Sequence, residues 1–167
     1  QLFSFPDFRA SERAFQLLAQ VGGRAGRKSK PGKVLIQSNQ IDHPVLQYIK
    51  DYNFDGFYFE ELLTRKQYNY PPYASLIQLT VKHKKPEEVR LASAFLANEL
   101  RAKLGRQVLG PSTPLVSKVR NMYLRQILIK VEKNSKAILH SKAILKTVLD
   151  ETQRQFRSAF IAVEVDA

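Results

Sequence analysis

The chain has 167 residues, of which 44% are hydrophobic, and 27 Lys and Arg against 15 Asp and Glu give it a formal net charge of +12. This length and composition allow one ordinary domain, or a small domain with part of another, and they allow a real hydrophobic core. The absence of cysteine excludes disulfides and thiolate metal sites from this sequence, and no apolar run approaches the ~20 residues of a membrane span.

The positive charge is unevenly distributed along the chain. Residues 1–37 carry seven basic and two acidic side chains, residues 38–72 carry three and five, and residues 73–167 carry seventeen and eight. Both ends are therefore basic, and an acidic segment separates them. A solubilising surface is one explanation, but a surplus of this size favours contact with a polyanion such as nucleic acid.

In chain order, the first predicted element is a helix that leads into an arginine motif. The helix is indicated by apolar residues that share one helical face, Ala14, Leu17, Leu18 and Val21. Asp7 or Ser11 is available as its N-cap. The motif that follows reads Gln20-Val21-Gly22-Gly23-Arg24-Ala25-Gly26-Arg27, which has the form Q-x-x-G-R-x-G-R.

The glycine-rich turn predicted for this motif would present two guanidinium groups side by side. Their planar donors match phosphate oxygens in pairs, and glycine has no Cβ to keep a polyphosphate away. An ordinary helix end is the alternative, in which glycine stops the helix and arginine satisfies its last carbonyls. The motif by itself leaves both interpretations open.

Between this motif and residue 72 the pattern predicts one strand and two helices. A short buried strand is predicted over residues 33–37, an apolar run between turn residues. A helix begins at Pro44, and a longer one is predicted from Phe54 to Asn69. Two prolines, Pro71 and Pro72, stop the second helix and mark a hinge between domains.

From Tyr73 onward the pattern alternates between strands and helices. Strands are predicted at 73–82, 107–109, 122–132 and 160–166, and helices at 86–104 and at about 135–151 after Asn134 or Ser135 as cap. The order β-α-β-β-α-β is that of a split βαβ sandwich, ferredoxin-like in plan, with both helices on one face of the sheet. The predicted fold class is therefore α+β.

Cations gather around the start of the third of these strands. Lys118, Arg120 and Arg125 surround Tyr123 in the sequence. In nucleic-acid-binding proteins such cations contact phosphates, and a tyrosine ring can stack on a base. We interpret this stretch as a DNA contact, and the alternative is a solvated loop with Tyr123 half buried. The three histidines, His43, His83 and His140, are isolated in the sequence, so we predict no metal site.

Two separated runs carry a resemblance to a known family. The run from Pro6 to Arg27, and the run from Arg65 to Tyr73 with its Tyr-Pro-Pro-Tyr ending, resemble the primosomal protein N′ (PriA) family of DNA helicases, which restart stalled replication forks. The resemblance implies three parts. Residues 1–40 would be the C-terminal remnant of a RecA-like helicase lobe 2 with its motif VI, residues 41–72 a helical linker, and residues 73–167 a C-terminal domain likened to ribosomal protein S10.

The resemblance also implies roles in nucleotide chemistry. Arg24 and Arg27 would act as arginine fingers on the γ-phosphate of ATP held mainly by the other motor lobe, and Gln20, Gly23 and Gly26 would help to bind that nucleotide. The parent helicase would use ATP and Mg²⁺ and would hold zinc in a cysteine module. We expect this chain, which starts without Met and has no P-loop, to be a fragment that binds none of these alone and does not hydrolyse ATP by itself.

The expected partners follow from the same resemblance. They are branched or single-stranded DNA, other primosome proteins and the acidic tail of single-stranded-DNA-binding protein, which would dock on Lys136 and His140. We expect a cytoplasmic monomer without membrane contact. The alternative is a non-enzymatic RNA-binding protein of the ribosomal S10 type, which explains the charge and residues 73–167 but does not explain the arginine motif.

Overall fold

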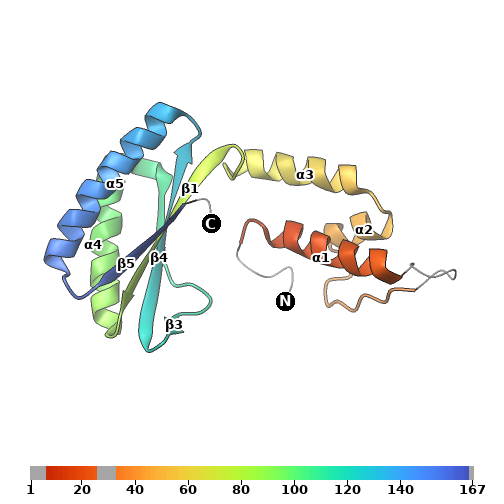
Figure 1. Cartoon of the computed structure of the whole chain (residues 1–167), viewed down its shortest axis with the longest axis horizontal. Coiled ribbons are helices and arrows are strands. Elements are labelled where there is room, and N and C mark those ends of the chain that lie inside the picture. Colours follow the sequence, from red (N-terminus) through yellow and green to blue (C-terminus); the bar gives the residue numbers. More distant parts are fainter. Residues whose placement is uncertain (1–6, 26–32, 166–167) are drawn as a thin grey trace. The chain divides into compact units, whose positions relative to one another are not determined.

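The structure, a computed structural model, describes residues 7–25 and 33–165. It divides the chain into two compact units, Gln1–Tyr68 and Asn69–Ala167. The first unit is helical in its described residues, and the second combines helices with a sheet (Figure 1).

Three helices make up the described secondary structure of the first unit, α1 (Ala10–Ala25), α2 (Pro44–Lys50) and α3 (Phe54–Gln67). Side chains of the preceding turns cap α2 and α3. His43 accepts a hydrogen bond from the Val45 amide at 3.3 Å, and Asn53 accepts one from the Gly56 amide at 2.9 Å. Pro44 occupies the first turn of α2 as predicted, because proline lacks the amide hydrogen that would be unpaired there.

A small aromatic core and one arginine hold these helices together. The buried residues are Ala14, Phe15, Val45 and Phe57, and the Phe15 and Phe57 rings stack with centroids 4.1 Å apart. Beside this core, Arg65 of α3 donates to Glu12 of α1 at 2.7 Å and to Glu61 at 3.0 Å. Both bonds join charged groups, which makes them stronger than neutral hydrogen bonds.

Helix α1 differs from the predicted helix at its end and on its buried face. It continues through Gly22 and Gly23 to Ala25, so Arg24 lies in its last turn and not in a glycine-rich turn after it. The predicted apolar face is also wrong in part, because Leu17 and Val21 are exposed and Phe15 is buried with Ala14. The reason is that α1 packs on α2 and α3 along a narrow stripe only.

The strand predicted over residues 33–37 is wrong for this structure. These residues have no regular secondary structure, and Leu35 is 96% exposed. A strand is stable only when its amide and carbonyl groups pair with a neighbouring strand. The described residues of the first unit contain no other strand, so the apolar run has nothing to pair with.

The second unit is built on one antiparallel sheet. Its elements in order are β1 (Ala74–His83), α4 (Pro86–Leu104), the short 3₁₀ helix η1 (Gly105–Gln107), β2 (Val108–Ser112), β3 (Lys118–Val119), β4 (Met122–Glu132), α5 (Ser135–Gln155) and β5 (Phe160–Val165). The main strand order is β2-β4-β1-β5, and β3 pairs with β4. The predicted α+β class is confirmed, and Figure 1 shows α4 and α5 on the same side of the sheet.

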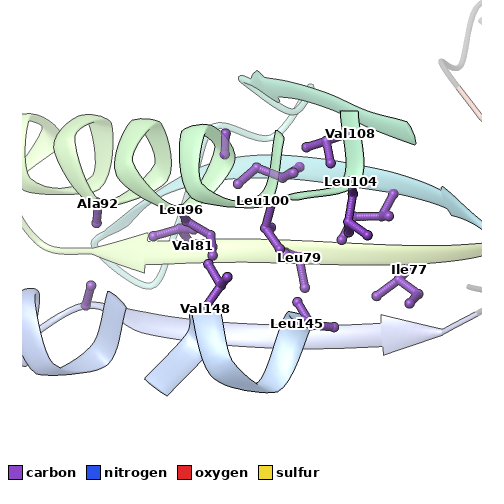
Figure 2. Close-up of a cluster of buried hydrophobic side chains, with 14 of the residues drawn as sticks. Ile77, Leu79, Val81, Ala92, Leu96, Leu100, Leu104, Val108, Leu145 and Val148 are labelled. Carbon is purple, nitrogen blue, oxygen red and sulfur yellow. The ribbon is translucent and has the colours of Figure 1, made fainter. Parts of the chain in front are cut away.

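The core of this unit lies between the sheet and its two helices. Alternate residues of β1 point to the helices, and they meet apolar residues of α4 and α5 (Figure 2). The residues of this core that are fully buried include Leu79, Val81, Leu96, Leu100, Ile127, Ile129 and Val148. The pattern is the one expected when a sheet covers its apolar face with amphipathic helices.

Helices α4 and α5 begin, and α4 ends, at the residues that the sequence predicts. Pro86 begins α4, and Gly105 ends it with φ +59°, a left-handed conformation that favours glycine. Asn134 caps α5 by accepting a hydrogen bond from the Ala137 amide at 2.7 Å. The sequence missed the short strand β3, which folds back on β4 as a hairpin.

Gly110 is required by the path of β2. Its φ is +95°, and a Cβ at this position would lie 2.8 Å from the Gln126 carbonyl oxygen of β4. Any other residue would therefore be strained and would push the two strands apart. The predicted strand at 107–109 stops before Gly110, whereas β2 includes it.

We predict that Leu96→Ala lowers the free energy of unfolding of the second unit by about 2–5 kcal/mol, because it removes buried methylene groups and leaves a cavity. Leu96 is fully buried. Urea denaturation followed by circular dichroism measures the change. The matched control is Leu91→Ala on the same helix, which is 42% exposed and should cost far less. Equal losses in the two variants would contradict the placement of this core.

Candidate nucleic-acid interface

The described part of the arginine motif lies on one face of α1. Gln20 and Arg24 are four residues apart in this helix, so their side chains are neighbours, and both are exposed. Arg24 makes no ion pair with any described residue. Gly23 has no atom within 4 Å of the position that a Cβ would occupy. Gly26 and Arg27 lie outside the described residues.

This arrangement supplies a cation without a complete nucleotide site. An exposed guanidinium group beside a carboxamide is chemically suited to phosphate oxygens. The described residues hold no group of three or more His, Asp or Glu side chains that could bind a metal ion. Within the described residues, Arg24 thus presents one exposed cation at the end of α1.

The second unit gathers a larger set of cations at one end of its sheet. In the strand register, Lys82 of β1 pairs with Leu124 of β4 on one side and with Phe160 of β5 on the other. The Lys82 ammonium group lies 5.6 Å from the centre of the Phe160 ring. Because paired residues point to the same side, Lys82 and Phe160 share the face opposite α4 and α5.

The hairpin of β3 and β4 adds cations at the same end. Lys118 pairs with Tyr123, and its ammonium group lies 4.8 Å from the centre of the tyrosine ring. Arg120 occupies the turn between the strands with φ +47°. Tyr123 is half buried against the core, whereas Phe160 is 57% exposed. The geometry therefore offers Phe160 as the more accessible ring for a base.

His83 connects the two turns that border these strands. Its Nδ1 accepts a hydrogen bond from the Lys85 amide at 3.0 Å, and its Nε2 lies 3.1 Å from the Ser158 hydroxyl oxygen. Since Nδ1 is an acceptor, Nε2 carries the proton and donates to Ser158. The buried ring thus orders the β1–α4 turn and the α5–β5 turn together.

We call the resulting cluster the basic end of the sheet. It is formed by Lys82, Lys84, Lys85, Lys118, Arg120, Arg125 and Arg157, which come from the end of β1 and its turn, the β3–β4 hairpin and the α5–β5 turn. Lys82 points away from α4 and α5, whereas Arg125 pairs with the core residue Val81 and points to the side of the helices, so the basic end includes both faces of the sheet. Glu87 lies near it at the start of α4, but Arg90 donates to its carboxylate at 3.0 Å and lowers the pKa of Glu87. The charge of Glu87 is therefore balanced by Arg90.

The structure separates the predicted partner-binding residues from this cluster. Lys136 and His140 are exposed in the first turns of α5, and α5 starts where β4 ends. The basic end lies where β4 begins. The 11 residues of β4 span about 36 Å at 3.3 Å each, so the two sets occupy opposite ends of the sheet. They form two surfaces and not one.

The sequence alone predicts only part of the basic end. Lys118, Arg120, Tyr123 and Arg125 are predicted because they are close together in the sequence. The sequence does not predict Lys82, Lys84, Lys85 or Phe160, which lie far from them in the sequence. Three lysines surround His83 in the sequence. Only the pairing of β1 with β4 and β5 shows at which end of the sheet these lysines lie.

No helix in the described ranges 7–25 and 33–165 is long and apolar enough to cross a membrane.

Comparison with known proteins gives a consistent family assignment. Residues 66–167 match the family model for the primosomal protein N C-terminal domain. The chain is 34% identical over 163 residues, 96% of its length, to replication restart protein PriA of Bacillus subtilis. It is 40% identical over 141 residues, 83% of its length, to replication restart protein PriA of Synechocystis. It is also 40% identical over 130 residues, 76% of its length, to replication restart protein PriA of Rickettsia felis.

The match covers a limited part of these relatives. The chain spans 20% of the Bacillus subtilis protein, 17% of the Synechocystis protein and 19% of the Rickettsia felis protein. The basic end of the sheet lies wholly within the residues that the family model matches.

We predict that neutralising any one cation of the basic end reduces the salt dependence of DNA binding. In Lys82→Gln, Lys118→Gln, Arg120→Gln or Arg125→Gln, the slope of log K against log salt should fall by about one, because one phosphate contact releases about one counterion. Fluorescence titration with labelled single-stranded and forked DNA at several salt concentrations measures the slope. Lys146→Gln, exposed on α5, is the control with the same charge change. If the slope falls equally in Lys146→Gln, the DNA does not bind specifically at the basic end.

We also predict that His83→Ala weakens DNA binding several-fold while leaving the salt slope unchanged, because it disorders two turns without removing a cation. The loss of its hydrogen bonds should lower the free energy of unfolding by about 1–3 kcal/mol. DNA titration and urea denaturation measure the two effects. His140→Ala, exposed on α5, should change neither. A reduced slope in His83→Ala would mean that the histidine itself contacts phosphate.

Proposed function

Because the chain belongs to the primosomal protein N C-terminal domain family, we propose that it is the C-terminal part of an ATP-dependent 3′-to-5′ DNA helicase that restarts stalled replication forks. The observation that carries the proposal is the basic end of the sheet, assembled from three segments inside the residues that the family model matches. The names of the relatives, replication restart protein PriA, support the biological role.

In this proposal the second unit binds branched or single-stranded DNA. Its strand order β2-β4-β1-β5 and its two helices on one face support a ferredoxin-like split βαβ plan with β3 inserted as a hairpin. The cations of the basic end would contact phosphates, and Phe160 would stack on a base that leaves the duplex. A fork offers both kinds of group at one place, since its strands separate there.

The first unit would serve the motor. Arg24, exposed at the end of α1 and beside Gln20, would stabilise the negative charge that develops on the phosphoryl group of ATP held by the other lobe. ATP with Mg²⁺ supplies the energy of the reaction when it is bound. The exposed Val34, Leu35 and Ile36 fit this proposal, because a strand of a motor lobe needs neighbouring strands for pairing.

Partner binding would use the opposite end of the second unit. Lys136 and His140 lie on one face of α5, four residues apart, and its first turn contains no acidic residue. We propose this face for the acidic tail of single-stranded-DNA-binding protein. Because this face lies far from the basic end, the tail and DNA would bind at the same time.

A ribosomal S10-like RNA-binding protein is the competing function. It would use the same basic end but would need neither Arg24 nor ATP. The two functions are distinguished by nucleotide chemistry in the full-length protein, not by affinity for nucleic acid.

We predict that Arg24→Ala in the full-length parent lowers DNA-stimulated ATP turnover roughly 10³-fold or more, because a missing arginine finger leaves the transferred charge unstabilised. DNA affinity should be unchanged, since the basic end is intact. A phosphate-release assay and a DNA titration measure the two properties.

Arg13→Ala is the matched control for this experiment. Arg13 lies on the same helix, is largely exposed and pairs with Asp7 at 2.6 Å. It should leave ATP turnover within a few-fold of the unchanged protein. Normal turnover in Arg24→Ala would refute the finger role, and a parent protein without any ATP turnover would favour the S10-like function.

A further inference from the structure

A pocket opens between α1, α2 and α3 in the first unit. Its floor is made by the buried side chains of Val45 and Phe57, and its walls include Pro44 and Tyr48. Glu60 and Thr64 of α3 stand at its rim. The three helices are visible in Figure 1. A pocket with an aromatic floor and a carboxylate rim matches a flat cationic group better than it matches a neutral or anionic one.

The two carboxylates at this pocket are in different states. Glu61 is engaged by Arg65 at 3.0 Å. Glu60 accepts a short hydrogen bond from the Tyr48 hydroxyl and makes no ion pair with a described residue. A carboxylate has about four lone-pair sites, so this one bond leaves Glu60 with unused acceptor capacity. The pocket therefore has a negative charge available to a cation that enters from outside.

The neighbouring Arg65 shows which cation these helices accommodate. Its guanidinium group is held by Glu12 at 2.7 Å and Glu61 at 3.0 Å, and it lies 5.2 Å from the centre of the Phe8 ring. Two carboxylate oxygens and an aromatic face thus bind one guanidinium group. At the pocket, Glu60 and the Tyr48 and Phe57 rings repeat this combination without an arginine of their own.

The segment that forms most of the pocket is acidic in an otherwise basic chain. Residues 38–72 carry five acidic and three basic side chains in a chain of net charge +12. A pocket that holds an arginine side chain is typical of the centres of protein interfaces.

We propose that this pocket is a docking site for an arginine side chain presented by a partner protein. The guanidinium group would bond to Glu60 and lie against Tyr48 and Phe57. Arginine is preferred over lysine because its planar group both stacks on rings and donates in pairs to a carboxylate. The acidic rim excludes nucleic acid as the occupant. The proposal does not depend on the helicase role.

The test is a titration of this chain with N-acetyl-L-arginine methylamide, followed by ¹H–¹⁵N NMR shifts. Shifts should be confined to the residues around the pocket on α2 and α3. N-acetyl-L-citrulline methylamide, which has the same shape without the charge, should bind at least several-fold more weakly. Equal shifts with both compounds would overturn the proposal.

Two variants locate the site. Glu60→Gln should weaken arginine binding about tenfold, because it removes a hydrogen bond between charged groups. Glu151→Gln, an exposed carboxylate on α5, makes the same change elsewhere and should have no effect. Unchanged binding in Glu60→Gln, with circular dichroism showing the native helix content, would overturn the proposal.

The source of the arginine is tested on the full-length parent. If the compound binds to the parent as it binds to this chain, the pocket is open to a partner protein. If the parent does not bind it, residues of the parent itself fill the pocket, and the docking of a partner is refuted.

Discussion

The central strand β1 determines how the second unit is organised. It pairs with β4 along ten residues and with β5 along six, always antiparallel. Because its side chains alternate, one face contributes Ile77, Leu79 and Val81 to the core, and the other face carries Lys82 outward. The same pairing that buries the apolar residues therefore also fixes the position of the cations. Core and basic end are two consequences of one strand register.

The ends of β1 and β5 are further joined by a buried histidine. His83 binds the Lys85 amide and the Ser158 hydroxyl, so the turns that carry lysine and arginine side chains are ordered by one imidazole ring. Such ordering matters for a surface that binds a charged polymer. Cations on disordered turns would lose conformational freedom on binding, and that loss would reduce affinity. The polar contact thus connects the stability of the fold to its proposed function.

The first unit shows the opposite balance between core and surface. Its buried residues are few. The guanidinium group of Arg65, which is bound by both Glu12 and Glu61, adds to the contacts that hold its helices together. Several of its large apolar side chains are exposed, among them Leu35 and the aromatic residues of α3. Exposed apolar surface of this kind marks places where other protein surfaces bind. The proposals for the motor lobe and for the arginine pocket both follow from this feature.

The sequence by itself determined the α+β class, the order of the elements in residues 73–167 and the positions of their caps. These depend on local patterns, such as alternation in β1, Pro86 at a helix start and Gly105 at a helix end. It also determined the family, through the arginine motif and the Tyr-Pro-Pro-Tyr run. The roles of Arg24, Arg27, Lys136 and His140 stay predictions.

Only the tertiary structure decided which distant residues come together. The strand at 33–37 failed because pairing requires a neighbour, and local sequence does not supply one. The end of α1 and its buried face depended on where α2 and α3 touch it. Strand pairing brings segments that are far apart in the sequence to the basic end, among them Lys82, Lys84, Lys85 and Phe160. No local pattern of residues predicts this pairing.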